Sequence, residues 1–138
     1  MNKTIIQENL PKHIAITMDG NGRWAKEKGK NRIFGHNQGI EAVRDTVEGA
    51  VEYGIKFLTL FAFSTENWNR PKHEVNALMK LLISSIHNET KTLLKNNIKL
   101  QTIGDTKQLP QQCQNELEEC IKLTKENSSM TLTLALSY

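Results

Sequence analysis

The most informative segment for chemistry is Asp19–Ala25, which reads Asp-Gly-Asn-Gly-Arg-Trp-Ala and follows a short apolar run. Gly20 and Gly22 let the backbone approach a ligand closely and expose consecutive N–H groups that can cradle an anion. Arg23 adds a forked donor that suits phosphate oxygens. Asp19 could hold Mg²⁺ through one carboxylate oxygen together with oxygens of a bound diphosphate. The pattern indicates a phosphate-bearing ligand, although Asp-Gly and Asn-Gly also occur in ordinary turns.

A second polar turn, Ser64–Pro71, also follows an apolar run and reads Ser-Thr-Glu-Asn-Trp-Asn-Arg-Pro. Asn67 can both donate and accept hydrogen bonds, and Arg70 can bind a further phosphate oxygen. Trp68 offers either an apolar plate for a hydrocarbon or an anchor for packing. The alternative interpretation makes this an ordinary turn and places Trp68 in the core.

Positive charge is concentrated just after the first turn. Five Lys and Arg side chains and one carboxylate, Glu27, lie between residues 23 and 32, whereas the net charge of the whole chain is only +3. Arg32 and His36 could donate to the same anion, because the start of an expected helix favours negative charge. A local cationic patch favours a small anionic ligand and argues against a nucleic-acid partner. For the lysines, a solvated helix face is the simpler alternative.

The two turns need a framework that brings them together. Four apolar runs have the length and pattern of strands: residues 13–19, 57–63, 99–104 and 130–136. Three segments carry apolar residues at helical spacing: residues 40–51, 75–86 and 109–121. A short helix is also expected after the first turn, and Pro71 is expected to open the second long helix.

Strands that alternate with helices predict an α/β fold, with a parallel sheet flanked by helices. The run 57–63 is apolar on both alternating faces, as expected of an interior strand with helices on both sides. Ligands bind such sheets outside the carboxyl ends of the strands. The following turns should therefore meet at one edge of the sheet: residues 19–24, 64–70, 104–106 and 137–138.

Length and composition predict a single α/β domain over residues 1–138, since the chain is 38% apolar and 24% charged. We expect a soluble cytoplasmic protein, because no segment has the pattern of a leader or the length to span a bilayer. Cys113 and Cys120 lie on one expected helix, too far apart for a disulfide, and are expected to be small core residues. The last expected strand ends at Tyr138, which suggests an incomplete sheet.

Four segments, in this order, resemble the cis-prenyltransferases of the undecaprenyl diphosphate synthase type. They are residues 13–25, Gly35-His36, residues 58–71 and Ile103-Gly-Asp105. The likeness runs from about residue 13 to residue 138. It implies the fold of that family, with the carboxyl-terminal part of the family missing from this chain.

The resemblance also implies roles for the residues of the two turns. Asp19 would be the essential carboxylate, associated with Mg²⁺ and with departure of the diphosphate, and Asn67 would accept a proton. The residues implied to bind the allylic diphosphate are Gly20, Asn21, Gly22, Arg23, Arg32 and His36. Those implied to line or order the substrate site are Trp24, Ser64, Thr65, Glu66, Trp68 and Arg70.

The implied reaction adds isopentenyl diphosphate to an allylic diphosphate such as farnesyl diphosphate by ionisation, condensation and elimination. Its product would be a long-chain polyprenyl diphosphate such as undecaprenyl diphosphate, for the cell-wall lipid carrier. The growing chain would need an apolar tunnel, and residues 75–86 are the candidate for part of its wall. A full-length member would be a homodimer, with transient contact through its lipid product at the inner face of the membrane.

One departure from the family pattern concerns the second substrate. The family's Gly-Gly-Arg and Arg-Thr-Ser-Gly-Glu-type segments, which bind isopentenyl diphosphate, do not occur in this sequence. A noncatalytic accessory subunit is one alternative, but it would be expected to lack Asp19, Asn67 or the arginines, and all are present. A phosphatase or phosphotransferase using Asp19 as nucleophile would want a second acidic or basic partner near the same strand end, and none is evident.

Overall fold

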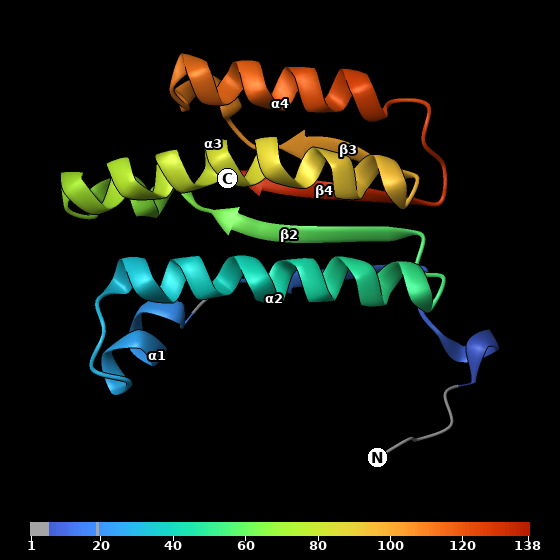
Figure 1. The fold of residues 1–138 in the computed structure, drawn as a ribbon, viewed down its shortest axis with the longest axis horizontal. Helices are drawn as coiled ribbons and strands as arrows, with labels where there is room; N and C mark the ends of the chain where they lie inside the picture. Colours follow the sequence, from blue (N-terminus) through green and yellow to red (C-terminus); the bar gives the residue numbers. More distant parts are fainter. Residues whose placement is uncertain (1–5, 19) are drawn as a thin grey trace.

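The computed structural model describes residues 6–18 and 20–138, so the expected catalytic and metal-binding residue Asp19 lies outside the described residues. Four strands and four α-helices alternate along this part of the chain (Figure 1). The elements are β1 (His13–Thr17), α1 (Asn21–Glu27), α2 (Arg32–Glu52), β2 (Phe57–Phe63), α3 (Lys72–Lys95), β3 (Ile98–Ile103), α4 (Gln111–Thr124) and β4 (Met130–Leu136). Three short 3-10 helices accompany them: Gln7–Asn9, Thr65–Asn69 and Thr106–Gln108.

All four strands pair in parallel, in the order β1-β2-β4-β3, which confirms the predicted sheet. The connections from β1 to β2 and from β2 to β3 step in the same direction across the sheet. Right-handed crossovers therefore place α2 and α3 on the same face, where Figure 1 shows them running side by side. The carboxyl ends of all four strands point towards one edge, so the polar turns collect there.

The core lies between this face of the sheet and the helices. Leu58 and Leu60 of β2 are fully buried, and they stand in register with Leu132 and Leu134 of the neighbouring strand. Helix α4 runs beside the outer edge of β3, where the Leu100 N–H donates to the Thr124 hydroxyl. Since an unpaired edge strand invites association, this contact protects one edge of the sheet.

Within the described residues, the opposite face of the sheet is buried at its centre, at Thr59, Thr133 and Ala135, and exposed towards its margins. Ala15 and Thr17 of β1, Phe57 of β2, and Gln101 and Ile103 of β3 are all exposed. Both long helices that precede and follow β2, α2 and α3, lie on the first face, so the prediction that helices cover β2 on both sides stays a prediction. The apolar content of β2 correctly indicated an interior strand but did not reveal that both long crossovers pack on one face.

The start of α2 differs from the sequence prediction. The helix begins at Arg32 rather than near Ile40, and the Asn31 side chain caps it by accepting a hydrogen bond from the Phe34 N–H. Its first turns carry Gly35 and Gly39, both buried against Asn21, so this stretch shows no apolar stripe. Arg32 and His36 consequently lie within the helix rather than ahead of it.

Cys113 and Cys120 are buried core residues, as predicted. Burial raises the pKa of the Cys113 thiol to about 11, with a smaller contribution from Glu116. Burial also raises the pKa of the Cys120 thiol, although a hydrogen bond from Thr90 opposes that shift. Both thiols are thus held in their unreactive protonated form. None of the helices in the described part of the chain is long and apolar enough to cross a membrane.

Candidate active site

The two polar turns and the first part of α2 enclose a cavity of about 380 Å³ at the carboxyl edge of the sheet. Eight residues expected to bind substrate or act in catalysis line it: Gly20, Asn21, Gly22, Arg23, Arg32, His36, Asn67 and Arg70. They come from segments nearly fifty residues apart, and the parallel sheet is what brings them together. The prediction that these turns meet at one edge is confirmed.

The first turn is shaped by glycine. Gly20 has a φ of 89°, a conformation that other residues seldom adopt, and its carbonyl accepts the N–H of Trp24 as α1 begins. Gly22 is buried, and a Cβ placed on it would lie 2.9 Å from the Arg32 guanidinium. The turn thus leaves room for the Arg32 side chain to lie directly against its backbone.

Helices α1 and α2 pack through a second close contact. A Cβ at Gly35 would clash with the backbone carbonyl oxygen of Asn21, and one at Gly39 would lie 2.7 Å from the Asn21 side-chain nitrogen. The backbone of the first turn therefore rests on the glycine-bearing face of α2. This contact fixes the distance between the turn and the arginine and histidine that α2 supplies.

The effect of Gly35→Ala on stability tests this packing. We expect it to lower the free energy of unfolding by about 1–3 kcal/mol, because the new methyl group meets backbone that cannot easily move. Gly49→Ala in the same helix is the matched control, since a Cβ there meets nothing within 4 Å. The control should stabilise the protein by about 0.5–1 kcal/mol. Urea unfolding of the two variants would contradict this contact if they changed stability equally.

In the second turn, Asn67 is held by Ser64. The Asn67 Oδ1 accepts from the Ser64 N–H at 2.8 Å and from its hydroxyl at 3.2 Å, which closes the turn at its amino end. Ser64 is thus the residue that orients Asn67. With its oxygen engaged twice, Asn67 could accept a substrate proton only after releasing one of these bonds, while its amide N–H groups can donate.

Trp68 acts as a packing anchor in this structure. Its ring meets Phe63 edge to face at 4.7 Å, and its N–H donates to the Ser137 hydroxyl at 2.9 Å. The contact ties the second turn to the end of β4. Of the two interpretations of Trp68, an apolar plate for a hydrocarbon or a packing anchor, the geometry favours the second.

Five residues predicted to line or order the substrate site do not form the wall of this cavity: Trp24, Ser64, Thr65, Glu66 and Trp68. Trp24 is 41% exposed and stacks on Phe34 at 6.0 Å. Thr65 and Glu66 lie exposed on the second turn. Their roles remain predictions from the resemblance alone.

Glu74 was not predicted, and the structure places it at the site. Its side chain is buried, and Oε1 lies 3.4 Å from both His36 Nε2 and Arg70 Nη1. A Glu four residues after Arg70, in the first turn of an expected helix, was a visible signal in the sequence. Its contact with His36 was not, because it requires α2 and α3 to be adjacent.

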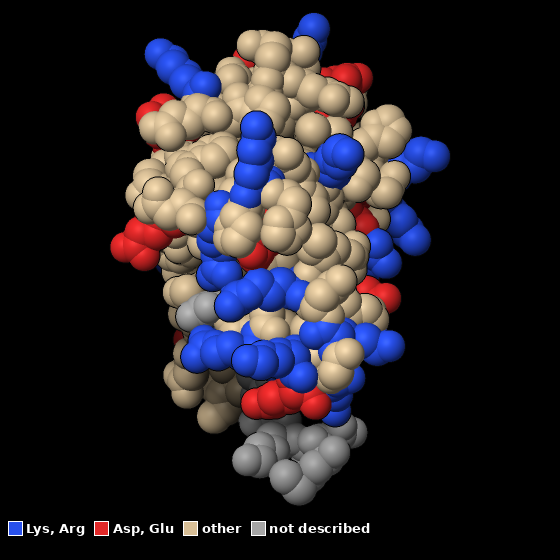
Figure 2. Space-filling view, turned by 90° about the vertical axis from the view of Figure 1, so that its left-hand side faces the viewer, with Lys and Arg blue, Asp and Glu red and all other residues tan. Residues whose placement is uncertain are grey.

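Basic side chains gather on the face that carries the cavity. Figure 2 shows Lys and Arg concentrated over one half of this face. A second hollow of about 290 Å³ lies there, lined by the cationic residues Arg23, Lys26, Lys30 and Arg32 with Gly22 and Asn31. Both the lysines and the two arginines are exposed, but only Arg23 and Arg32 of these four residues line both hollows.

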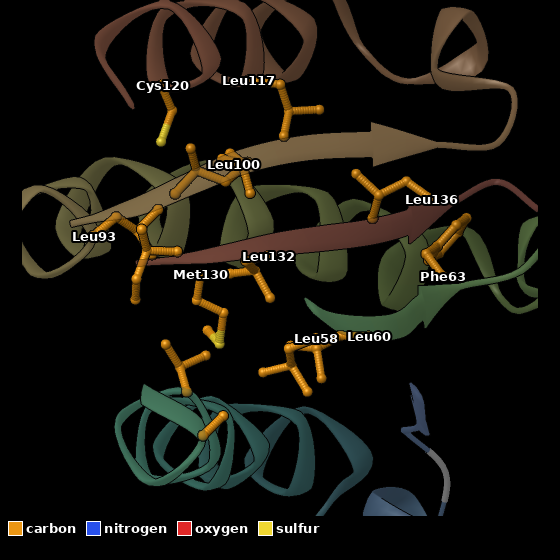
Figure 3. Close-up of a cluster of buried hydrophobic side chains, with 14 of the residues drawn as sticks. Leu58, Leu60, Phe63, Leu93, Leu100, Leu117, Cys120, Met130, Leu132 and Leu136 are labelled. Atoms are coloured by element: carbon orange, nitrogen blue, oxygen red, sulfur yellow. The ribbon is translucent and has the colours of Figure 1, made fainter. Parts of the chain in front are cut away.

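An apolar cavity of about 120 Å³ lies beside the cationic one, between α2, α3 and the sheet. The two cavities share Met18, Ile40, Ala62 and Leu82 in their walls. Deeper in, leucines from the strands and helices surround the second cavity, and several of them are visible in Figure 3. Helix α3 contributes to both walls, while the role of residues 75–86 in a tunnel for the growing chain stays a prediction.

An ion pair joins α2 and α3 along the wall of the apolar cavity. Arg44 Nε donates to both carboxylate oxygens of Glu89, at 3.0 and 3.2 Å, and its Nη2 also contacts the carboxylate. The hydrogen bond to Glu89 raises the pKa of Arg44. The two helices are therefore linked at two places, by this pair and by His36 with Glu74.

Among the described residues, neither His13, His87 nor the acidic side chains form a second candidate site. His13 bonds to Thr59 at 2.8 Å, His87 lies 3.7 Å from Glu116, and neither lines a cavity. Among residues 6–18 and 20–138, no three His, Cys, Asp or Glu side chains come together as a metal site. The role of Asp19 as a magnesium ligand stays a prediction, because Asp19 lies outside the described residues.

Comparison with known proteins agrees with this geometry. Residues 17–138 match the prenyltransferase family described as "Putative undecaprenyl diphosphate synthase". The ditrans,polycis-undecaprenyl-diphosphate synthase ((2E,6E)-farnesyl-diphosphate specific) of Pasteurella multocida is 55% identical over 130 residues, which cover 94% of this chain and 54% of that protein. An isoprenyl transferase of Chlorobaculum tepidum is 56% identical over 94% of this chain and 49% of its own length.

A solved structure also resembles the chain in fold. Lavandulyl diphosphate synthase from Lavandula x intermedia, in complex with dimethylallyl diphosphate, superposes with a TM-score of 0.90 at 34% identity. The match covers 93% of this chain and 55% of that one, and the chain spans about half the length of the curated relatives it matches. The fold and the sequence both match this family, and the matched residues include the two polar turns. The chain therefore belongs to the prenyltransferase family of undecaprenyl diphosphate synthases.

Proposed function

We propose that this chain forms the allylic-diphosphate site of a cis-prenyltransferase that extends farnesyl diphosphate with isopentenyl diphosphate. One observation carries the proposal: a cavity lined by Arg23, Arg32 and Arg70 lies directly beside an apolar cavity, with which it shares four wall residues. This arrangement suits an amphiphile with an anionic head and a hydrocarbon tail. Inorganic anions would use only the first cavity, and fatty chains without a strong anion only the second.

The size of the cationic cavity is consistent with this assignment, whereas the apolar cavity is too small in this structure for a polyprenyl tail. The cationic cavity, at about 380 Å³, lies within the usual range of ligand sites of about 300–1,000 Å³. The apolar cavity of about 120 Å³ is smaller than that range. A polyprenyl tail would therefore have to widen the space between α2 and α3, which meet across this cavity.

The residues in the cavity supply what the ionisation step needs. When the allylic C–O bond breaks, negative charge grows on the departing diphosphate, and arginine donors and N–H groups fixed at that position stabilise it. The double bond of isopentenyl diphosphate then forms the new C–C bond, and a proton leaves the adjacent carbon. Asn67, at the wall of the same cavity, is the proposed residue near that proton. Mg²⁺, held by Asp19 and phosphate oxygens, would further neutralise the leaving group.

The isopentenyl diphosphate site is proposed to lie outside this chain. The chain spans about half the length of its relatives and lacks the segments that the family uses for that substrate. The product would be undecaprenyl diphosphate for the cell-wall lipid carrier. Homodimerisation, and transient contact with the inner face of the membrane through the product, belong to this proposal for the full-length protein.

Binding by the 138-residue chain tests the proposal. We expect weak but measurable binding of an unreactive farnesyl thiodiphosphate, and weaker binding of inorganic diphosphate, because the latter lacks the tail. With isopentenyl diphosphate and Mg²⁺ the same sample should form no polymer, while a full-length synthase carrying this segment should form one. Calorimetry and incorporation of labelled isopentenyl diphosphate give the two readouts.

Three outcomes would count against the proposal. Equal affinity for inorganic diphosphate and for the farnesyl analogue would remove the amphiphile argument. Polymer formation by the verified 138-residue chain would place the second substrate site within it. A full-length protein that binds the analogue but never elongates it would favour the accessory-subunit alternative.

A further inference from the structure

Glu74 is an unusual residue for its position. It is the one charged side chain that is buried among the described residues, with 5% of its surface exposed. A buried carboxylate costs considerable free energy unless it is paired. Its location, in the first turn of α3 next to the cationic cavity, is also unexpected, since a diphosphate ligand would repel it.

The two partners of Glu74 explain its burial. Oε1 contacts Nε2 of His36, from α2, and Nη1 of Arg70, from the second turn, each at 3.4 Å. His36 and Arg70 line the cavity, whereas Glu74 does not. The carboxylate thus contacts two donors of the cavity wall that come from different segments of the chain.

The contacts with Glu74 determine which nitrogens of His36 and Arg70 can still bind a ligand. An ionised carboxylate only accepts, so the nitrogen of His36 that faces it, Nε2, must carry the hydrogen, as inferred from the partner. A diphosphate oxygen only accepts, so Nδ1 can bind it only in the doubly protonated ring, in which Nδ1 carries a hydrogen as well. Arg70 contacts Glu74 through one terminal nitrogen and keeps N–H groups on the others for a phosphate oxygen.

We propose that Glu74 is a positioning residue, which holds His36 and Arg70 together so that both can bind one diphosphate. The inference rests on the proposed function, because it assigns a role at that same site. Glu74 does not itself touch the ligand; it fixes two flexible donors in advance, which reduces the entropy lost on binding. Through its contacts with His36 and Arg70 it also links α2 to the second turn.

A simpler role for Glu74 is to stabilise helix α3 alone. A carboxylate in the first turn of a helix stabilises that helix, and a pair four residues apart adds a small amount. This role predicts that loss of Glu74 lowers stability without a specific change in ligand affinity. The positioning role predicts that the effect on affinity depends on whether Arg70 is present.

The test uses a full-length synthase that carries this segment, with Glu74→Ala, Arg70→Ala and the double variant. Calorimetry with farnesyl thiodiphosphate should show about tenfold weaker binding for Glu74→Ala, the size of one charge-assisted hydrogen bond. In the double variant, the loss should be clearly smaller than the product of the two single losses, because the partners act as a unit. Steady-state kinetics should show KM for farnesyl diphosphate rising more than kcat falls.

Two further variants keep the result interpretable. Glu74→Gln retains the side-chain shape and an accepting oxygen, so it should fold even if Glu74→Ala does not, and should bind with intermediate affinity. Glu118→Ala, on the exposed side of α4, is the control and should bind as the parent does. Unchanged affinity in folded Glu74→Gln and Glu74→Ala, or losses that multiply in the double variant, would overturn the positioning role. A parent protein that does not bind the analogue would overturn the proposed function itself.

Discussion

Asp19→Ala in a full-length synthase carrying this segment is expected to lower turnover by orders of magnitude while leaving the affinity for farnesyl thiodiphosphate nearly unchanged. A carboxylate that acts through Mg²⁺ on the departing diphosphate contributes mainly in the transition state, so its loss appears in kcat rather than in ground-state binding. Initial rates with farnesyl diphosphate, isopentenyl diphosphate and Mg²⁺ give kcat. Calorimetry with the unreactive analogue gives the affinity.

Asp45→Ala is the matched control for this experiment, because Asp45 is an exposed aspartate of α2 that lines none of the three cavities. It should keep the parent's rate and affinity. If Asp19→Ala retained near-parent turnover, the assignment of Asp19 to the metal-linked step would be wrong. A large loss of affinity with little further loss of kcat would make Asp19 a ground-state binding residue instead.

The strands were the part of the fold that the sequence predicted best. Short apolar runs bounded by Gly and Asn have few alternative structures, and the observed β2 and β4 have the predicted limits. The turn chemistry was equally informative, because parallel strands must end at one edge. Knowing that two polar turns follow such strands was enough to bring Arg23, Asn67 and Arg70 into one cavity.

What the sequence could not show depends on contacts between elements. The start of α2 was missed because Gly35 and Gly39 bury backbone rather than side chains, which leaves no apolar periodicity. The placement of α2 and α3 on one face was missed because apolar residues on both sides of β2 do not reveal what covers them. Glu74 was missed because its burial depends on His36, a residue thirty-eight positions away.

The same limit applies to the residues predicted at the site. Trp24 and Trp68 were drawn from motifs, but a motif does not say which side chain faces a ligand and which holds the turn. Trp68 bonds to Ser137 and packs on Phe63, so its structural role is satisfied without a ligand. Conversely, the Gly22 backbone was predicted to cradle an anion. The structure shows a second reason for glycine at this position, because the Arg32 side chain packs against its backbone.

The second large effect is expected for the three arginines of the cavity. Arg23→Ala, Arg32→Ala and Arg70→Ala should each weaken binding of farnesyl thiodiphosphate by about 1.5–3 kcal/mol, if each makes one charge-assisted hydrogen bond to the diphosphate. This corresponds to a rise in Kd of about 10- to 150-fold. Calorimetry at fixed ionic strength measures it, since salt weakens the contribution of exposed charges.

Lys28→Ala separates a binding role from a general effect of charge. Lys28 belongs to the same basic patch, is exposed, and lines none of the three cavities, so its removal should change affinity far less than removal of any of the arginines. If all four variants weakened binding by the same small factor, the patch would act only through its overall field, as a solvated surface does. The alternative outcome is that only the arginine variants lose affinity for the farnesyl analogue, and that the variants rank in the same order in their affinity for inorganic diphosphate. The lost affinity would then be assigned to contacts with the diphosphate group. The apolar cavity would then account for the additional affinity of the farnesyl analogue, because the arginine variants leave the residues that surround the tail unchanged.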